Sequence, residues 1–259
     1  MEVVPLATAD EVGALAADAI EALLRAQPSA VLGLATGSSP LPAYQELIRR
    51  HRAGTAPSYA EVRCFTLDEY VGLPAGHPET YRETIFRELT DGLEIDRARV
   101  ASPDASDPQH AGPRYEEAIL AAGGVDLQVL GIGADGHLAF NEPGSSLASA
   151  TRMKTLTDET RRDNARFFES VDDVPRHVLT QGLGTILRAR HLLLVATGSG
   201  KAAAVAAAVE GPLSASCPAS VLQLHPHATV LLDDQAASGL ARLDYYREVY
   251  AGKPSWQGL

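Results

Sequence analysis

Three ionisable side chains follow a predicted buried strand within a span of eight residues. The segment 125–132 is mostly apolar and rich in β-branched residues, which favours a strand buried in a sheet. Asp135, His137 and Glu142 come directly after it, among the glycines at positions 131, 133 and 136. Open parallel sheets bind ligands at the carboxyl ends of their strands, so this cluster is well placed for proton transfer. A turn whose Asp and His bond only to the backbone is the structural alternative.

The same segment contains the spacing Gly-x-Gly-x-x-Gly, between Gly131 and Gly136. In dinucleotide-binding proteins a helix opens at this loop, and its N-terminus faces the pyrophosphate. Here the sequence Asn141-Glu-Pro-Gly-Ser145 follows and breaks a helix within a turn or two, which argues against a dinucleotide site. Asp135 and His137 could bind a metal together, but the chain lacks a zinc pattern, and we expect neither a metal nor another cofactor.

A further acidic side chain stands at the end of another predicted strand. Residues 62–67 alternate and favour a strand, and Asp68 follows it directly. Its carboxylate could act as a general base, or it could cap the turn that comes next. The local sequence leaves both interpretations open.

Two turns with the sequence Ala-Thr-Gly-Ser, at residues 35–38 and 196–199, could bind an anion. Each lies between a predicted strand and a predicted helix, where backbone N–H groups and hydroxyls face the turn. Lys201 adds a positive charge to the second. This is not a Walker A motif, because Val195 stands where that motif needs glycine and Ala202 where it needs serine or threonine. Each turn alone fits an ordinary strand-to-helix connection, but together they favour a phosphorylated small molecule.

Positive charge concentrates in one short segment after Glu142. Residues 152–166 contain the basic side chains Arg152, Lys154, Arg161, Arg162 and Arg166. Most of them fit the solvated face of a helix in which opposite charges pair. The segment is also the best source of an arginine for a substrate phosphate.

Strands and helices alternate along the chain. The sequence Thr8-Ala-Asp-Glu11 is a capping box that opens a helix. Strands are predicted at residues 2–6, 31–35, 62–67, 99–101, 125–132, 191–196, 221–224 and 229–232, and helices at residues 9–26, 41–52, 79–89, 109–122, 174–188, 202–210 and 235–250. This alternation predicts one α/β domain over residues 1–259, built on an open, mostly parallel sheet with helices on both faces.

The chain of 259 residues is acidic, with a formal net charge of −11. This charge argues against a nucleic-acid surface and gives no support for binding to anionic membranes, so a phosphate site must be built locally. The two cysteines, Cys64 and Cys217, fit a reducing compartment and cannot form a disulfide framework. The N-terminus lacks a basic and apolar leader, and no apolar run reaches membrane-spanning length. We therefore expect a cytoplasmic protein.

Three segments resemble the glucosamine-6-phosphate deaminase family. They are Thr66-Leu-Asp-Glu-Tyr-Val-Gly-Leu-Pro74, Gly131-Ile-Gly-Ala-Asp-Gly-His-Leu-Ala-Phe-Asn-Glu-Pro-Gly-Ser-Ser-Leu147 and Leu222-Gln-Leu-His-Pro226. The resemblance spans nearly the whole chain. The related 6-phosphogluconolactonases share the fold and an Asp-Gly-His, but the continuation Ala-Phe-Asn-Glu-Pro resembles the deaminases. Residues 36–40, Thr-Gly-Ser-Ser-Pro, depart from the Thr-Gly-Gly-Thr-Pro common in that family but keep a hydroxyl.

The resemblance implies a modified Rossmann-like fold of the sugar-phosphate isomerase/deaminase type and a reaction without a cofactor. In amino-sugar catabolism, glucosamine 6-phosphate and water would become fructose 6-phosphate and ammonia. His137 would move a proton between the ring oxygen and the anomeric hydroxyl, with Asp135 and Glu142 holding its tautomer. Asp68 would transfer the C2 proton to C1. By the same match, the substrate phosphate would be held by Gly37, Ser38, Arg166 and Lys201.

Some members of this family are hexamers activated by N-acetylglucosamine 6-phosphate. Ser145, Arg152, Lys154 and Thr155 match that effector site, so the resemblance allows an effector and a homo-oligomer. A mobile lid is expected around residues 156–176. Two other hypotheses stay open. One is a different enzyme on this fold, either a 6-phosphogluconolactonase-like hydrolase or a deaminase for galactosamine 6-phosphate. The other is a non-catalytic sugar-phosphate sensor.

Overall fold

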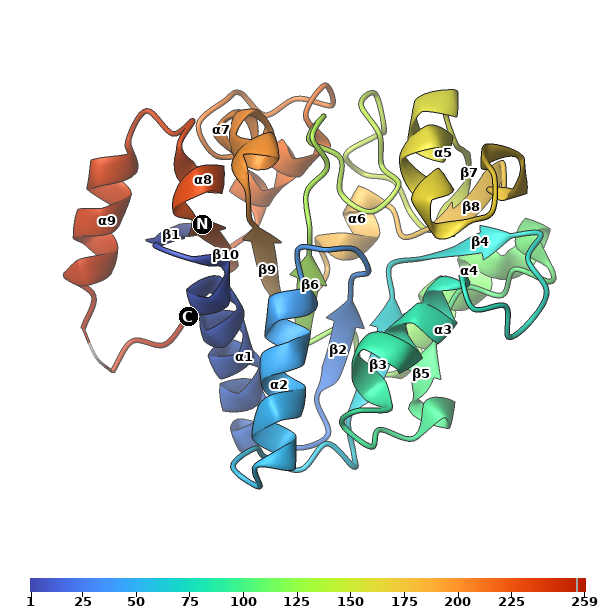
Figure 1. Ribbon diagram of the computed structural model, residues 1–259, viewed down its shortest axis with the longest axis horizontal. Coiled ribbons are helices and arrows are strands. Elements are labelled where there is room, and N and C mark those ends of the chain that lie inside the picture. Colours follow the sequence, from blue (N-terminus) through green and yellow to red (C-terminus); the bar gives the residue numbers. More distant parts are fainter. Residues whose placement is uncertain (255) are drawn as a thin grey trace.

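A seven-stranded parallel sheet forms the centre of the molecule (Figure 1). The computed structural model describes residues 1–254 and 256–259, without the side chains of Glu159 and Asp163. The strand order is β1-β10-β9-β6-β2-β3-β5, and neighbouring strands are parallel. The strands are β1 (Glu2–Leu6), β2 (Val31–Leu34), β3 (Arg63–Thr66), β5 (Val100–Ala101), β6 (Leu127–Leu130), β9 (His191–Ala196) and β10 (Ala228–Asp233). The predicted fold class is thus confirmed.

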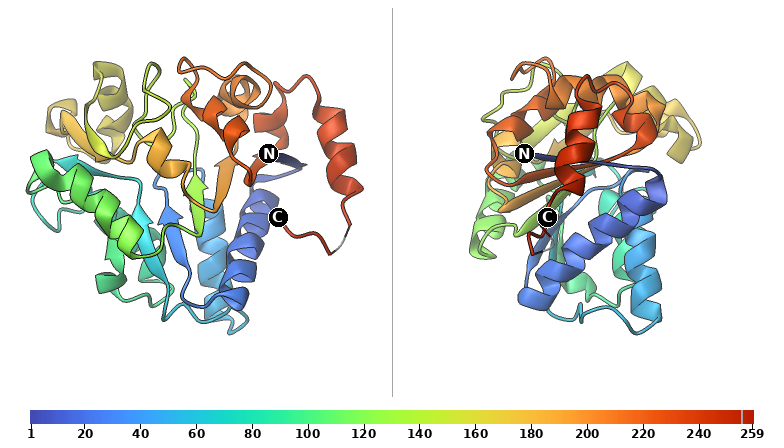
Figure 2. Two further views of the ribbon diagram at one scale, coloured as in Figure 1. Left: turned by 180° about the vertical axis from the view of Figure 1, so that it is seen from behind. Right: turned by 90° about the vertical axis from the view of Figure 1, so that its left-hand side faces the viewer.

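Helices cover the sheet on both faces, as an all-parallel sheet requires. Every residue of β2, β6, β9 and β10 is buried. Helices α1 (Ala9–Ala26) and α2 (Leu41–Arg52) lie on one face of the sheet. The opposite view shows α4 (Pro108–Ala121) and α6 (Leu183–Ile186) on the other face (Figure 2). Within the described residues, every helix falls short of the length and apolarity that crossing a membrane requires.

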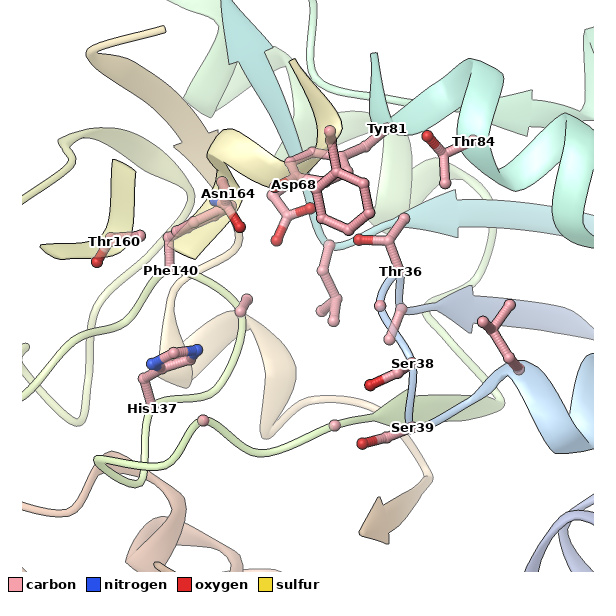
Figure 3. A pocket seen from close by; sticks show the side chains of 18 of the residues that line it. Thr36, Ser38, Ser39, Asp68, Tyr81, Thr84, His137, Phe140, Thr160 and Asn164 are labelled. Atoms are coloured by element: carbon pink, nitrogen blue, oxygen red, sulfur yellow. The ribbon is translucent and has the colours of Figure 1, made fainter. Parts of the chain in front are cut away.

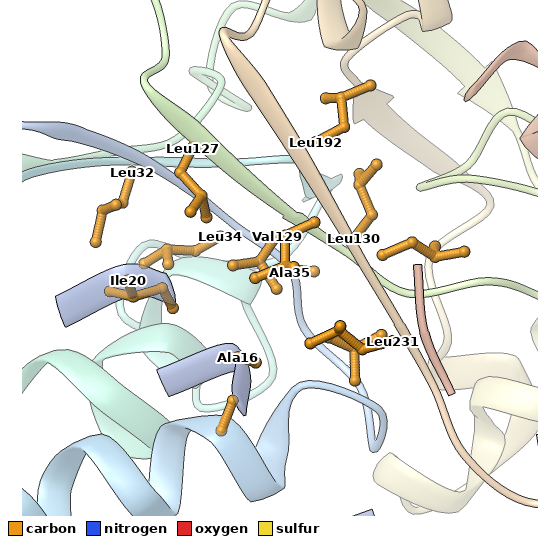
Figure 4. Close-up of a cluster of buried hydrophobic side chains, with 14 of the residues drawn as sticks. Ala16, Ile20, Leu32, Leu34, Ala35, Leu127, Val129, Leu130, Leu192 and Leu231 are labelled. Atoms are coloured by element: carbon orange, nitrogen blue, oxygen red, sulfur yellow. The ribbon is translucent and has the colours of Figure 1, made fainter. Parts of the chain in front are cut away.

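The spacing of apolar residues in α1 places one stripe of the helix against the sheet. Ala16 and Ile20 lie in the same buried cluster as Leu34 of β2 and Leu231 of β10 (Figure 4). The predicted N-cap is confirmed at the start of the helix, where Thr8 Oγ1 accepts a hydrogen bond from the backbone N–H of Glu11 at 3.2 Å, while the carboxylate of Glu11 accepts the backbone N–H of Ala7 rather than that of Thr8.

A second, three-stranded antiparallel sheet was not predicted. It contains β4 (Asp68–Val71), β8 (His177–Thr180) and β7 (Arg152–Thr155), in the order β4-β8-β7. The predicted helix over residues 174–188 is therefore wrong at residues 177–180, and the predicted helix face that begins at residue 152 is wrong at residues 152–155. Strand β8 pairs with a neighbour on each side, and this long-range pairing overrides local spacing. In the basic segment, α-helix is confined to α5 (Asp158–Asn164).

Three other helical regions differ from the prediction. Residues 221–224, predicted as a strand, belong to the 3₁₀ helix η6 (Pro218–Leu224), because a short apolar run does not distinguish a buried strand from a buried helix. The predicted helix 235–250 is divided into α8 (Asp234–Ala237) and α9 (Leu243–Ala251). Residues 79–89 form α3 (Tyr81–Ile85) and the π-helical turn η1 (Phe86–Thr90). The remaining helices are η2 (Arg97–Arg99), η3 (Ala165–Phe167), η4 (Val171–Asp173), η5 (Ser199–Lys201) and α7 (Ala202–Val209).

Gly182 joins β8 to α6 where the chain runs against another segment. A Cβ atom at this position would lie 2.1 Å from the carbonyl oxygen of Ser149 and 2.4 Å from that of Ala150. Because both atoms belong to the backbone, we expect Gly182→Ala to lower the free energy of unfolding by about 2 kcal/mol or more, measured by urea denaturation. Gly258→Ala is the control, since its Cβ would meet no atom within 4 Å. Equal stability of the two variants would contradict this expectation.

Candidate active site

The loops at the carboxyl ends of the parallel strands enclose a cavity of about 730 Å³ (Figure 3). Its walls come from the turn after β2, the junction of β3 and β4, the loop after β6, helix α3 and residues 160–168. Among its lining residues are Thr36, Gly37, Ser38, Asp68, Tyr81, His137, Thr160, Asn164, Arg166 and Lys201. The cavity therefore brings together side chains from segments that are far apart in the sequence.

Asp68 is the first residue of β4 and pairs with Thr180 of β8. Its side chain faces the cavity (Figure 3), yet the residue is only 6% exposed. Burial raises the pKa of Asp68 to about 8, and the charge of the neighbouring Glu69 acts in the same direction. Once ionised, a carboxylate with such a pKa is a stronger base than an exposed aspartate.

The neighbouring Glu69 binds backbone N–H groups at the start of α3, whose N-cap residue is Thr80. The carboxylate of Glu69 accepts hydrogen bonds from the backbone N–H groups of Tyr70, Tyr81 and Arg82 at 2.8, 2.9 and 3.1 Å. Since Tyr81 and Arg82 open α3, Glu69 fixes the first turn of that helix. Burial raises the pKa of Glu69, and the three hydrogen bonds oppose that shift. Sequence reasoning missed this residue, although it lies inside the motif of residues 66–74.

Asp135 and His137 form the closest pair of predicted site residues. His137 Nδ1 lies 2.6 Å from Asp135 Oδ1, which also accepts the backbone N–H of His137 at 3.1 Å. Gly136 between them has a φ of 84°, a conformation that glycine adopts readily. The hydrogen bond from His137 lowers the pKa of Asp135. Because an ionised carboxylate only accepts, Nδ1 carries the proton and Nε2 remains to serve the cavity.

Glu142 makes a contact with a different segment. Its Oε1 accepts a hydrogen bond from Thr160 Oγ1 at 2.6 Å, and in the described part of the chain no hydrogen bond or ion pair joins it to the imidazole of His137. Thr160 belongs to α5 and lines the cavity. Asp135 is thus in direct contact with His137, whereas the contact made by Glu142 is with Thr160. No sequence signal pointed to Thr160, since its contact with Glu142 crosses 18 positions.

Asn141 fixes the backbone of the loop that carries these residues. It is fully buried, and its Nδ2 donates to the carbonyl oxygens of Leu138 and Gln181 at 2.9 and 2.8 Å. Its Oδ1 accepts a hydrogen bond from Nη1 of Arg152 at 2.9 Å. Arg152, predicted for an effector, therefore also contacts the catalytic loop. The sequence contained Asn141 in the central motif but gave it no role.

The residues predicted at a substrate phosphate all line the cavity: Gly37, Ser38, Arg166 and Lys201. Gly37 has a φ of 98°, and α2 begins after it without a side-chain cap, so that backbone N–H groups face the turn. The second Ala-Thr-Gly-Ser turn differs, because the N–H of Gly198 donates to the carboxylate of Asp233 at 3.0 Å. Of residues 196–201, Lys201 alone is among the lining residues that the structure describes.

Residues 156–176 contribute five residues to the cavity wall, and hydrogen bonds within the segment hold it together. The buried side chain of Arg161 donates from Nε to the carbonyl oxygen of Val174 at 3.2 Å, and from Nη2 to that of Val171 at 2.7 Å. At the far end, the ring of Phe168 lies 5.8 Å from that of Tyr70 in an edge-on arrangement. Arg161 is thus part of this segment rather than of a solvated helix face.

The residues predicted for an effector lie on and near β7, away from the cavity wall. Alternation along the strand puts Arg152 and Lys154 on one face and Thr155 on the other, where Thr155 Oγ1 lies 3.2 Å from His177 Nδ1. Ser145 is buried, and its Oγ has no hydrogen-bond partner among the described residues. The strand therefore does not bring Thr155 together with the two basic side chains.

Side chains of the types that bind metals do not converge elsewhere. Among the described residues, no group of three or more His, Cys, Asp or Glu side chains could hold a metal ion. Cys64 and Cys217 are free thiols, and burial raises the pKa of both, that of Cys64 to about 12.

Sequence and fold are both similar to those of known proteins. The family model described as "Glucosamine-6-phosphate isomerases/6-phosphogluconolactonase" matches residues 5–231. The glucosamine-6-phosphate deaminase of Arthrobacter sp. (strain FB24) is 63% identical over 262 aligned residues, which cover 100% of both chains. A solved structure of a monomeric glucosamine-6-phosphate deaminase is 39% identical and covers 92% of this chain and 100% of its own, with a TM-score of 0.88. The 6-phosphogluconolactonase of Trypanosoma brucei, 21% identical, covers 93% of this chain and 98% of its own at a TM-score of 0.72, which shows the same fold.

The raised pKa of Asp68 should make the stability of the protein depend on pH. The folded protein binds this proton more tightly than the unfolded chain, in which an aspartate has a pKa of about 4, so stability is lost as the pH rises from about 4 to about 8. We expect Asp68→Asn to become more stable relative to wild type across this window, by at most about 1.4 kcal/mol per pH unit. Urea denaturation at several pH values measures this, with the exposed Asp244→Asn as the control. A stability difference that does not change with pH would contradict the assignment.

Proposed function

Because the chain belongs to the glucosamine-6-phosphate isomerase/6-phosphogluconolactonase family, we propose that it is a glucosamine-6-phosphate deaminase. It converts glucosamine 6-phosphate and water to fructose 6-phosphate and ammonia, a step in the catabolism of amino sugars. The observation that carries the proposal is a single cavity that contains the buried carboxylate of Asp68, the imidazole of His137 and the turn at Gly37. Full-length relatives at 57–63% identity bear the deaminase name, which favours this activity over a lactonase.

The phosphate of the substrate is held by the turn at Gly37 and Ser38, together with Arg166 and Lys201. Backbone N–H groups and the Ser38 hydroxyl donate to the phosphate oxygens, and the two cations compensate their charge. The phosphate does not react. Its binding energy orients carbons 1 and 2 of the sugar toward Asp68 and His137.

Ring opening requires a proton to move from the anomeric hydroxyl to the ring oxygen. His137 carries it through Nε2, because Asp135 fixes the proton on Nδ1. The product is the open-chain 2-amino aldehyde.

Asp68 performs the isomerisation. Its ionised carboxylate removes the proton from C2, the electron pair of that C–H bond forms the C1–C2 double bond, and the aldehyde oxygen takes a proton from the ammonium group at C2 to become an enol. Return of the proton to C1 leaves an iminium at C2. Water adds to this carbon, and the C–N bond of the carbinolamine breaks to release ammonia and leave the ketone. The pKa of about 8 makes Asp68 a base of useful strength for this step.

We also propose that residues 156–176 act as the lid of this cavity within one α/β domain, and that the protein works in the cytoplasm. Thr160, Asn164 and Arg166 of this segment line the cavity, which supports the first proposal. The free thiols of Cys64 and Cys217 fit a reducing compartment and support the second.

The first experiment measures release of ammonia and fructose 6-phosphate from glucosamine 6-phosphate. We expect turnover by the wild type and a loss of kcat of about 10³-fold or more in Asp68→Asn, with binding of fructose 6-phosphate retained. The value of kcat/KM for the wild type should rise with pH as Asp68 loses its proton, with a midpoint of about 8.

Other outcomes separate the other hypotheses. Turnover of galactosamine 6-phosphate in preference to the gluco epimer would mean a different deaminase, and hydrolysis of 6-phosphogluconolactone without ammonia release would mean a lactonase. Binding of glucosamine 6-phosphate without turnover would mean a sensor.

A separate proposal concerns regulation by N-acetylglucosamine 6-phosphate. We propose Arg152 and Lys154, on one face of β7, as the groups that bind its phosphate, with the unpartnered hydroxyl of Ser145 as a further donor and Thr155 nearby on the strand. The contact between Arg152 and Asn141 would transmit its binding to the catalytic loop.

Activation of the wild type by this compound, and loss of activation in Lys154→Met, is the expected result. An identical rate with and without the compound would reject the regulatory site. Sedimentation in the same buffer tests the homo-oligomer that the resemblance allows, and the mass of a single chain would match the monomeric relative instead.

A further inference from the structure

We propose that Thr160 is a positioning residue, whose hydroxyl holds the lid over the cavity by its hydrogen bond to Glu142. The inference rests on the proposed function, because it concerns the lid and a carboxylate of that active site. Thr160 itself need not touch the reacting atoms. It acts through Glu142 and through the lid side chains that line the cavity.

The hydrogen bonds around Thr160 have one possible direction. Thr160 Oγ1 lies 2.6 Å from Oε1 of Glu142 and 2.9 Å from Oγ1 of Thr157. A carboxylate oxygen accepts only, so the single hydroxyl proton of Thr160 goes to Glu142. The hydroxyl of Thr157 must then donate to Thr160, and it also accepts the backbone N–H of Thr160 at 3.2 Å. Glu142 is therefore the end of a chain of donors that begins at the first turn of α5.

The two ends of this contact differ in rigidity. Glu142 follows Asn141, which is fully buried and bonded to the backbone of Leu138 and Gln181. The lid is tied to itself through the bonds from Arg161 to the carbonyl oxygens of Val171 and Val174, and it packs on the rest of the site through the apolar side chains of Leu156 and Phe168. Apolar packing of this kind has little directional preference, so the directional bond between Thr160 and the fixed loop sets the position of the lid on that packing.

The position of the lid matters because it carries part of the substrate site. Asn164 and Arg166 line the cavity together with Thr160, and Arg166 is one of the groups proposed for the phosphate. Loss of the Thr160 hydroxyl should therefore weaken substrate binding more than it slows the chemical step, which Asp68 performs from a different wall.

The test compares Thr160→Val, which keeps the shape but removes the hydroxyl, with Thr160→Ser, which restores it. We expect Thr160→Val to raise KM about tenfold with kcat within about threefold of wild type, since a hydrogen bond to a charged group has about this effect. Thr160→Ser should stay close to wild type. Ser170→Ala is the matched control, because it removes a lid hydroxyl that donates to Asp173 at 2.7 Å away from the cavity.

A double-mutant cycle distinguishes this role from a merely structural one. If Thr160 acts through Glu142, then Thr160→Val should add no further rise in KM to Glu142→Ala. Additive losses, or an unchanged KM in Thr160→Val, would overturn the proposal. The rate of trypsin cleavage after Arg162, which is exposed on α5, reports opening of the lid in the absence of substrate. This rate should be several-fold higher in Thr160→Val. Absence of turnover in the wild type would reject the proposed function, whereas an equal cleavage rate in wild type and Thr160→Val would reject the role of Thr160.

Discussion

The cavity depends on one constraint, the burial of two adjacent carboxyl groups at the start of β4. Glu69 satisfies its oxygens with three backbone N–H groups, two of which open α3. Asp68 is buried beside that charge, and the result is its raised pKa. The two carboxyl groups point in different directions because they are neighbours on a strand. Alternation along β4 sends the side chain of Asp68 toward the cavity and that of Glu69 toward α3. Pairing with β8 holds β4 in place, so the small antiparallel sheet fixes the position of Asp68.

The same strand β8 joins the fixed parts of the site to one another. Thr180 pairs with Asp68, and its hydroxyl accepts the backbone N–H of Phe140 at 3.1 Å. The adjacent Gln181 accepts from Asn141 and donates to the carbonyl oxygen of Thr66 at 3.0 Å. The strand that carries the carboxylate of Asp68 and the loop that carries the imidazole of His137 are therefore positioned by buried backbone and amide groups. In the contacts described above, residues 156–176 reach the rest of the site through side chains, by the bond from Thr160 to Glu142 and by the packing of Phe168 on Tyr70.

The sequence predicted the features that depend on neighbouring residues and missed those that depend on contacts between distant segments. The parallel strands and the N-cap of α1 follow local patterns, and the position of Asp68 and His137 at strand ends follows from the strands. Strand β8 was predicted as helix, because its structure comes from pairing with β4 and β7 rather than from its own spacing. Glu69 and Asn141 stood inside recognised motifs, but their roles arise from contacts with α3 and Gln181 that a one-dimensional pattern does not contain.

The phosphate site has to work against the charge of the whole chain, which is −11. Such a surface disfavours weak binding of anions in general, so a phosphate is retained only where local donors converge. Arg166 belongs to the proposed lid, and its guanidinium lies 4.7 Å from the centre of the Phe167 ring, whereas Lys201 and the turn at Gly37 belong to the loops at the edge of the sheet. Substrate and product carry the same phosphate, so these contacts cannot tell one from the other. In the proposed mechanism, discrimination must therefore come from the other end of the sugar, where Asp68 acts on carbons that change during the reaction and His137 acts on the ring oxygen and the anomeric hydroxyl.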